Sequence, residues 1–420
     1  MSLNTTPSGE RTHIGIFGRR NAGKSSLINA ITSQSLAIVS NHKGTTTDPV
    51  YKAMELLPLG PVMMIDTPGI DDEGELGRLR IQKAYQVLNK TDITILVIDA
   101  AAGIAAEDTA LLQHIAAKNL PVVIVFNKSE LLDAKQRAAL TAALDELPLP
   151  QGFKVQHFFI STVTNENIHQ LKEALAALRP TEAERQLVGD LLQPMDVVAL
   201  VTPIDSAAPK GRLILPQQQV LRNILDNRAI AVVVQESELA AALAKLQTPP
   251  RLVITDSQAF AKVAQIVPQD VPLTSFSILF ARYKGSLANA VRGVQALDNI
   301  KDGDKILISE GCTHHRQCND IGTVKLPGWI KNYAKAEPEF HYTSGTEFPL
   351  DLSPYKLIVH CGGCMLNERE IIYRNKCAAD QSIPMTNYGI AIAYMHGILQ
   401  CTIQPLPDIA PLLQNNRKNK

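Results

Sequence analysis

The run from Gly18 to Ser25, Gly-Arg-Arg-Asn-Ala-Gly-Lys-Ser, limits the possible folds of this chain more than any other feature. It matches the pattern of a phosphate-binding loop, with glycines in the turn and Lys24 and Ser25 at its end. An apolar run at His13–Phe17 precedes the loop, and a segment with helical spacing at Ser25–Ile31 follows it. In this order, backbone N–H groups and a helix N-terminus can face a phosphate. The sequence therefore predicts a P-loop nucleotide-binding fold.

Strand-like apolar runs alternate with helix-length segments along the whole chain, which is typical of parallel βαβ units. The first set predicts one doubly wound sheet, and the interrupted pattern at Arg179–Arg185 predicts a linker. Two further sets predict two smaller parallel α/β domains. A chain of 420 residues is also longer than a single core usually organises. The expected fold class is α/β with three domains, at residues 10–178, 186–278 and 279–414.

A second motif, Asp66-Thr-Pro-Gly69, follows an apolar strand and supplies the carboxylate that magnesium needs. We expect Ser25 and Asp66 to hold Mg²⁺ and the Gly69 N–H to contact the γ-phosphate. Thr46 lies between the two motifs in a run of three threonines, where it can close onto the magnesium ion when a triphosphate is bound. The predicted catalytic residues are Lys24, Thr46, Asp66 and Gly69.

A third motif, Asn127-Lys128-Ser-Glu130, follows an apolar strand at the position of a guanine-reading motif. Glu130 replaces the usual aspartate and has the same carboxylate on a side chain one methylene longer, so guanine preference is predicted. Ser161, after the last strand, is expected to complete the base pocket; an ordinary polar turn is the alternative. The predicted nucleotide contacts are Gly18, Asn21, Gly23, Lys24, Ser25, Ser26, Thr46, Asp66, Gly69, Asn127, Lys128, Glu130 and Ser161.

All six cysteines lie after residue 310, a distribution that does not fit a disulfide framework and indicates a metal site in a reducing compartment. Cys312 and His314 follow one predicted strand, and the run His360-Cys361-Gly-Gly-Cys364 follows another. Because parallel strands end at one edge of a sheet, these two loops can converge. Three thiolates fit three corners of a [4Fe–4S] cluster, and a histidine, a carboxylate, water or an incoming ligand fits the fourth.

Zinc is the main alternative occupant, because cysteine and histidine in this spacing also suit a tetrahedral site. A zinc ribbon usually has C-x-x-C in both halves, whereas the first half here is C-x-H; the residues alone leave iron–sulfur and zinc equally open. Cys377 and Cys401 are isolated in helix-like or strand-like surroundings, so we expect them to pack in the core.

The phosphate loop, the threonine run at Thr46, the Asp66–Gly69 motif and the Asn127–Glu130 motif are four ordered motifs. Together they resemble those of the TrmE and Era type of GTPase over about 170 residues. Asn21 matches the asparagine with which potassium-activated members of that group hold the cation, so the resemblance implies a K⁺ site. Ile70 stands where many GTPases have a water-orienting glutamine, which implies slow intrinsic hydrolysis.

The chain joins such a GTPase domain to two cysteine motifs, C-x-H and, about 45 residues later, H-C-x-x-C. This combination resembles the HydF family, the GTPase maturation factors of FeFe-hydrogenases. The resemblance spans the whole chain and implies a middle dimerisation domain and a C-terminal [4Fe–4S] domain. It implies Cys312, Cys361 and Cys364 as cluster ligands, with His314 and His360 as candidate fourth ligands. It also implies a carrier of the di-iron precursor, which two radical-SAM maturases build and apo FeFe-hydrogenase receives.

The charge balance and the hydropathy of the chain limit the kinds of partner that it can bind. Lys plus Arg equals Asp plus Glu at 41 each, so no net field favours nucleic acid or an anionic membrane. No run of 18 uncharged apolar residues occurs, so we expect a soluble cytoplasmic protein. A homodimer through the middle domain is expected, because its parallel strands leave exposed edges. The alternative functions are a TrmE/Era-like regulatory GTPase with a structural zinc domain acting on RNA or ribosomes, and a GTP-gated iron–sulfur enzyme.

Overall fold

The structure is a computed structural model that describes residues 6, 8–32, 49–71, 74–178, 186–203, 213–311, 321–345, 347–363 and 365–414. The chain divides into two compact units, Met1–Glu182 and Ala183–Lys420. The predicted linker at 179–185 lies outside the described residues.

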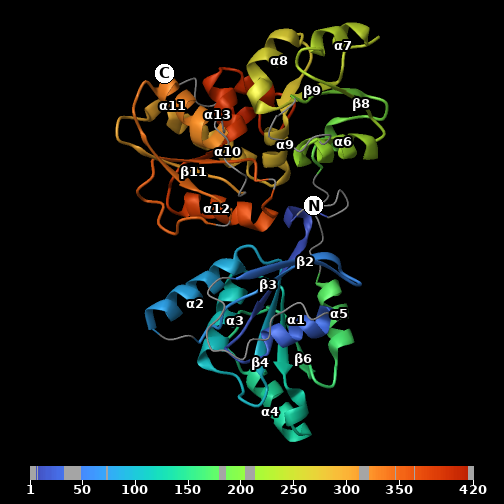
Figure 1. The fold of residues 1–420 in the computed structure, drawn as a ribbon, viewed down its shortest axis with the longest axis vertical. Helices are drawn as coiled ribbons and strands as arrows, with labels where there is room; N and C mark the ends of the chain where they lie inside the picture. The colour runs from blue at the N-terminus through green and yellow to red at the C-terminus, as the bar shows by residue number, and fades with distance from the viewer. Residues whose placement is uncertain are drawn as a thin grey trace. The chain divides into compact units, whose positions relative to one another are not determined.

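The first unit contains a six-stranded sheet in the order β2-β3-β1-β4-β5-β6 (Figure 1). Every neighbouring pair is parallel except β2 and β3, which are antiparallel. The strands are β1 (Thr12–Phe17), β2 (Val50–Leu56), β3 (Gly60–Asp66), β4 (Ile93–Asp99), β5 (Val122–Asn127) and β6 (Val155–Ile160). The helices are α1 (Lys24–Thr32), α2 (Gly74–Leu88), α3 (Ala106–Ala117), α4 (Ala134–Asp145) and α5 (Ile168–Ala177).

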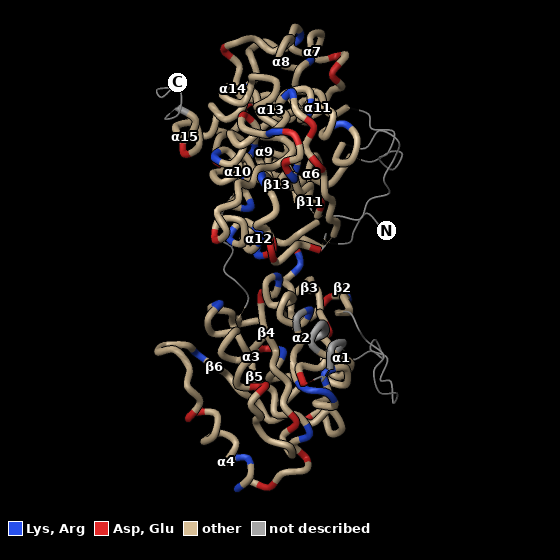
Figure 2. The backbone as a smooth tube through the Cα atoms, turned by 90° about the vertical axis from the view of Figure 1, so that its left-hand side faces the viewer, with Lys and Arg blue, Asp and Glu red and all other residues tan. Residues whose placement is uncertain are grey.

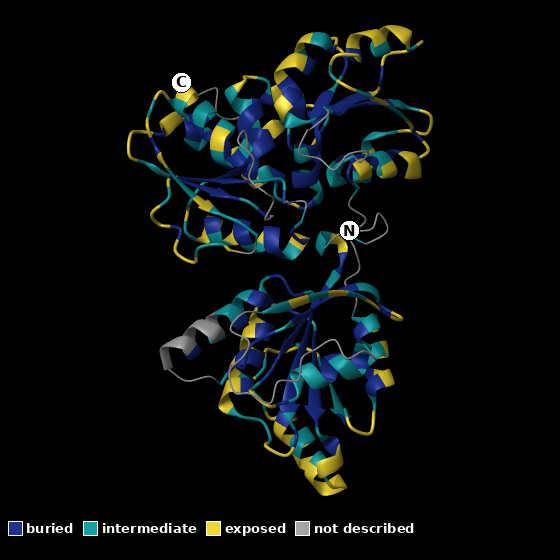
Figure 3. Ribbon diagram, viewed as in Figure 1, coloured by how far each residue is buried: buried dark blue, intermediate teal, exposed yellow. Residues whose placement is uncertain are grey.

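Two hydrophobic clusters cover the two faces of this sheet, because successive side chains of a strand point to opposite faces. In β5, Val123 and Val125 pack into the cluster that includes α1 and α5, whereas Ile124 and Phe126 pack into the cluster that includes α2 and α3. Strands buried on both faces read as continuous apolar runs, and Figure 3 shows these strands in the buried colour. The predicted doubly wound sheet is therefore confirmed.

The second unit contains two four-stranded parallel sheets, in the orders β10-β9-β7-β8 and β12-β11-β13-β14. The first has β7 (Val197–Val201), β8 (Ile230–Val234), β9 (Leu252–Thr255) and β10 (Leu273–Ser275), with α6 (Leu215–Asp226), α7 (Leu239–Lys245), α8 (Phe260–Ile266) and α9 (Phe276–Tyr283). The second has β11 (Lys305–Ser309), β12 (Glu339–Thr343), β13 (Leu357–His360) and β14 (Met385–Asn387), with α10 (Leu287–Gly293), α11 (Leu326–Ala334), α12 (Glu368–Asp380), α13 (Tyr388–Met395), α14 (Leu399–Ile403) and α15 (Pro411–Gln414).

One continuous hydrophobic cluster, from Leu187 to Ile409, joins these two sheets. It contains β7 and β9 of the first sheet, β11 and β13 of the second, and helices α9, α10 and α13. The shared core keeps the two sheets together, because separating them would expose their apolar side chains to water. Strands β11 and β13 of the second sheet are therefore anchored in a tightly packed core.

Short or irregular elements differ from the sequence prediction. Strands β2, β12 and β14 do not coincide with a strand-like apolar run, and α10 is followed directly by a 3₁₀ helix at Val294–Asn299. Lys and Arg are interspersed with Asp and Glu in both units (Figure 2). Among the described residues, no helix is both long and apolar enough to cross a membrane.

Candidate functional site

The phosphate loop lies between β1 and α1, as its sequence predicts. Lys24 Nζ donates hydrogen bonds of 2.8 Å to the carbonyl oxygens of Gly18 and Arg19, so the ammonium group lies against the loop. Ser25 Oγ donates to Asp66 Oδ2 at 2.9 Å. This contact follows from the sheet, because β1 and β3 are parallel neighbours and Asp66, the last residue of β3, pairs with Ile16, the next-to-last residue of β1. The hydroxyl and carboxylate predicted to hold Mg²⁺ are therefore together.

Two glycines of the loop have conformations that a side chain would disturb. Gly18 has φ +148°, and a Cβ there would lie 2.2 Å from the Val97 carbonyl oxygen. Gly23 has φ +91°, and a Cβ there would lie 2.1 Å from Nδ2 of Asn127. Asn127 Nδ2 donates to the Ala22 carbonyl at 2.9 Å, which ties the guanine-reading motif to the phosphate loop. The loop is thus built from backbone, as phosphate binding requires.

Asp66 is an acid in a mostly buried position. Desolvation raises the pKa of its carboxyl above the ordinary value, against the lowering effects of the Ser25 hydrogen bond and the Lys24 charge. A buried carboxylate without enough compensating charge favours binding of a cation. This electrostatic imbalance fits the Mg²⁺ that the motif implies.

The base-binding motif is arranged along the end of β5. Lys128 has φ +63°, and its Nζ lies 2.5 Å from Asp99 Oδ2. The buried Oδ1 of Asn127 finds no hydrogen-bond partner among the described residues, as expected of a group that contacts a ligand. Glu130 is exposed, and Ser161 is fully buried. Ser161 Oγ accepts the N–H groups of residues 163 and 164, so it shapes the turn after β6.

Of the two segments predicted to contact the γ-phosphate, the structure describes the one that contains Gly69. A Cβ on Gly69 would lie 2.5 Å from Cγ of Arg20, so the Asp-Thr-Pro-Gly loop passes close to the phosphate loop. The Arg20 N–H donates to Asp71 Oδ1 at 2.7 Å, a second link between these loops. Ile70 is buried and offers no polar group to a water molecule. Thr46 lies outside the described residues.

The two cysteine loops leave adjacent parallel strands, β11 and β13, in which Ser309 pairs with His360. The Cys361 N–H donates to the Ser309 carbonyl at 3.0 Å, and the Gly311 N–H donates to Cys361 Sγ at 2.9 Å. The predicted convergence of the two loops is therefore confirmed up to Gly311. Cys312, His314 and Cys364 lie outside the described residues.

The surroundings of Cys361 fit a thiolate ligand. Its Sγ accepts a second N–H, from Gly363 at 3.3 Å, and N–H groups that point at sulfur stabilise the thiolate form that metals bind. Within the ranges that the structure describes, no group of three or more His, Cys, Asp or Glu is placed to hold a metal ion. Three of the five predicted ligands are not in those ranges.

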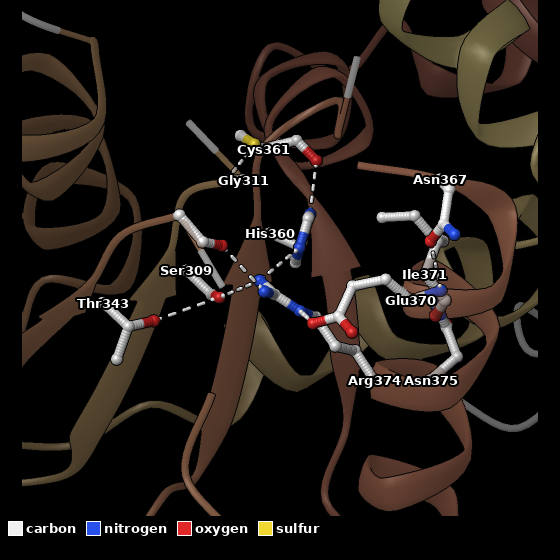
Figure 4. A network of polar contacts seen from close by, with 11 residues as sticks. Ser309, Gly311, Thr343, His360, Cys361, Asn367, Glu370, Ile371, Arg374 and Asn375 are labelled. Atoms are coloured by element: carbon white, nitrogen blue, oxygen red, sulfur yellow. Dashed lines mark hydrogen bonds and ion pairs between the residues drawn. The ribbon is translucent and has the colours of Figure 1, made fainter. Parts of the chain in front are cut away.

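Two buried cationic side chains, Lys284 and Arg374, contact this loop and the strand ends beside it, and no sequence pattern predicts them. Lys284 Nζ donates to the carbonyl oxygens of Gly363, at 2.6 Å, and Leu366. Arg374 is fully buried and lies within hydrogen-bond distance of Ser309 and His360 (Figure 4). Both contact residues more than ten positions away in the chain, so no local motif marks them. The spacing of Glu370 and Arg374 at i and i+4 after the cysteine loop was the one available signal.

The remaining described cysteines differ from each other. Cys377 is half-buried and packs against a small cluster that includes Leu307 and Met385, as predicted. Cys401 is exposed on α14, so the prediction of core packing is wrong for this residue. An amphipathic helix can place a cysteine on either face, and the short run around Cys401 does not reveal which one.

Three domain families match this chain. Residues 13–128 match the family described as 50S ribosome-binding GTPase, residues 187–285 match the hydrogen maturase F dimerization domain, and residues 288–405 match the hydrogen maturase F tetramerization domain. The last two together cover more than half of the chain and contain both cysteine loops.

The similar proteins match only part of this chain. The tRNA modification GTPase MnmE of Desulfotalea psychrophila is 35% identical over 161 residues, covering 38% of this chain and 33% of that protein. GTPase Der of Clostridium perfringens is 31% identical over 170 residues, covering 39% and 38%. The chain thus spans little more than a third of the length of these relatives. Among solved structures, Era from Aquifex aeolicus is 21% identical with a TM-score of 0.36, covering 53% of this chain and 93% of that one.

The matches give the order of the parts. A GTPase domain, with relatives among the MnmE and Der GTPases, precedes the dimerization and tetramerization domains of hydrogen maturase F. The Ser25–Asp66 contact beside the phosphate loop lies in the GTPase match, and the adjacent ends of β11 and β13 lie in the tetramerization-domain match. The chain belongs to the HydF-type maturation GTPases.

Proposed function

We propose that this chain is a GTP-hydrolysing scaffold that holds a [4Fe–4S] cluster on Cys312, Cys361 and Cys364 and delivers the di-iron precursor to apo FeFe-hydrogenase. The observation that carries this proposal is the Gly311 N–H bonded to Cys361 Sγ. Gly311 directly precedes Cys312, and Gly363, which also donates to Cys361 Sγ, directly precedes Cys364. The two residues that directly precede Cys312 and Cys364 in the sequence therefore both donate to Cys361 Sγ. His314 stays a candidate fourth ligand.

The GTPase half of the proposal rests on the first unit. Lys24 and the loop N–H groups would hold the phosphates, and Ser25 and Asp66 would hold a Mg²⁺ ion that neutralises phosphate charge. Asn21, at φ +58° in the loop, is the proposed K⁺ ligand, and Thr46 is proposed to join the magnesium site when GTP is bound. Asn127, Lys128 and Glu130 are proposed to select guanine.

The nucleotide state would act through the loops that contact the γ-phosphate. These loops become ordered when GTP is bound and are released after hydrolysis, so GTP can change which partner surfaces are presented. The proposed partners are the two radical-SAM maturases, apo-hydrogenase and a second copy of this chain. Equal affinity of the GDP form and the form with a non-hydrolysable GTP analogue for every purified partner would remove this coupling from the proposal.

Anaerobic reconstitution followed by iron and sulfide quantification tests the cluster. Replacement of Cys312, Cys361 or Cys364 by serine is expected to lower the iron content sharply. Cys401→Ser is the matched control, because Cys401 is exposed on α14 and should leave the iron content unchanged. Stoichiometric zinc without sulfide in the wild-type protein would instead support a structural zinc domain. Lys24→Ala should abolish GTP hydrolysis and leave the iron content intact.

A further inference from the structure

Arg374 on α12 is the largest side chain that the described part of the chain buries completely. Its Nε donates to Glu370 Oε1 at 2.8 Å, and its Nη2 donates to the Gly345 carbonyl at 2.9 Å. Its Nη1 donates to Ser309 Oγ at 3.1 Å and lies 3.1 Å from His360 Nε2. Figure 4 shows the guanidinium group between these partners. One side chain thus occupies the centre of a buried polar network.

The partners of Arg374 mark the ends of three neighbouring strands. Ser309 ends β11, Gly345 follows β12 shortly after its last residue, and His360 ends β13. Ser309 Oγ also accepts a hydrogen bond from Thr343 Oγ1 at the end of β12, at 3.1 Å. The two cysteine loops leave the sheet directly after Ser309 and His360. The β11–β13 pairing sets the spacing of these two strand ends, and Arg374 holds the Ser309 and His360 side chains at the points from which the proposed metal ligands extend.

The same contact determines which nitrogen of His360 carries the proton. A guanidinium group can only donate, so His360 Nε2 must accept from Arg374 Nη1. The proton is then on Nδ1, which donates to the Cys361 carbonyl oxygen at 2.6 Å. Both ring nitrogens are therefore hydrogen-bonded within the protein, and His360 as a residue is buried, with 3% of its surface exposed. A metal ion could bind this imidazole only after one of these bonds was broken.

A gain in stability alone does not explain this arrangement. A buried Arg–Glu pair loses its hydration, and an apolar replacement of the same size is often equally stable. The planar guanidinium group of one arginine, in contrast, carries several N–H donors in fixed directions. It can therefore hold several acceptors in fixed positions, which the single ammonium group of lysine cannot do. Metal ligands commonly depend on such outer contacts for their orientation.

We propose that Arg374 is a positioning residue of the metal site. It holds His360 as an Nδ1–H donor that orients Cys361, and it keeps this imidazole from acting as the fourth ligand. The proposal rests on the proposed cluster, because it concerns residues that would hold that group.

Arg374→Lys tests the positioning role in the full-length protein. Lysine keeps a positive charge beside Glu370 but cannot reach Ser309, Gly345 and His360 at once. We expect the reconstituted variant to lose iron to a chelator about tenfold faster than the wild type, the effect of about one lost charge-assisted hydrogen bond. Lys376→Gln, at an exposed position on the same helix, is the matched control and should release iron at the wild-type rate. Ser309→Ala removes only one acceptor and should give a smaller acceleration, even if Arg374→Lys folds poorly.

His360→Asn tests the ligand question, because asparagine keeps a donor near Nδ1 and removes Nε2. Pulsed EPR of the reduced protein should show the same ¹⁴N couplings in this variant as in the wild type. Loss of a strong ¹⁴N coupling would identify His360 as a ligand and overturn the proposal. Wild-type iron release in both Arg374→Lys and Ser309→Ala would overturn it as well. Failure of the proposed function is a separate result, in which the wild type binds no iron or Cys361→Ser binds as much as the wild type.

Discussion

Replacement of Gly23 by alanine is a direct test of how the phosphate loop is built. The new Cβ would lie 2.1 Å from Asn127 Nδ2, so the Asn127 amide must move. That movement breaks the 2.9 Å hydrogen bond from Asn127 to the Ala22 carbonyl. The guanine-reading motif and the phosphate loop would then lose their direct connection.

The magnitude of the effect has two parts. An L-residue at a left-handed φ, here +91°, costs about 1–2 kcal/mol. A buried carbonyl left without its donor costs about another 1–3 kcal/mol. Gly152→Ala separates these parts, because Gly152 has φ +83° and no atom within 4 Å of the added Cβ. We therefore expect a loss of unfolding free energy of about 2–5 kcal/mol for Gly23→Ala and about 1–2 kcal/mol for Gly152→Ala.

Calorimetry of the nucleotide-free and GDP-bound protein identifies the transition of the GTPase unit, since ligand shifts only the transition of the unit that binds it. Titration with a fluorescent GDP analogue measures affinity on the same samples. Gly23→Ala should bind at least about tenfold more weakly, because a cost of about 1.4 kcal/mol corresponds to a factor of ten. Gly152→Ala should bind like the wild type. Equal effects of the two substitutions on stability and affinity would refute the role assigned to the Asn127 contact.

Three further predictions concern the same unit. Burial raises the pKa of the Asp66 carboxyl above its ordinary value of 3.8. Asp66 therefore contributes most to the unfolding free energy at pH values below 3.8, and this contribution is lost as the pH rises through the raised pKa. The nucleotide-free Asp66→Asn variant should therefore have a higher melting temperature than the wild type at pH 7, and the difference should shrink toward pH 4. The variant should also lose Mg²⁺-dependent hydrolysis. A difference in melting temperature that does not change with pH would contradict this reasoning. Glu130→Asp should tighten GDP binding, because the shorter carboxylate is the one that guanine-reading motifs normally use, and an unchanged titration would show that Glu130 does not read the base. Replacing Na⁺ by K⁺ should raise the hydrolysis rate about twofold in the wild type and leave Asn21→Ala unchanged, whereas equal rates in both salts would rule out the K⁺ site.

Much of the fold and of the nucleotide site could be predicted because the relevant information is local. A phosphate loop is one contiguous segment, and its glycines, lysine and serine stand at fixed spacings. Strands buried on both faces form apolar runs, so β4 and β5 were recognised without knowledge of their neighbours. The convergence of the cysteine loops followed from a general rule, that parallel strands end at one edge of a sheet, and the pairing of Ser309 with His360 agrees with it.

The elements that could not be predicted depend on distant partners. Strand β14 has three residues, and β12 is an edge strand with a mixed pattern, so neither has a signal above its surroundings. The exposure of Cys401 depends on which face of a short helix meets the core, and that is decided by the rest of the second unit.

By itself, the sequence determined that the chain binds phosphate through a P-loop and carries two cysteine loops at the ends of strands, because residue type and spacing encode both features. The tertiary structure alone decided what supports those loops. Arg374 reaches Ser309 across 65 positions, and Lys284 reaches Gly363 across 79. A buried cation is stable only where folding brings enough acceptors around it, and no local pattern in the chain records that arrangement.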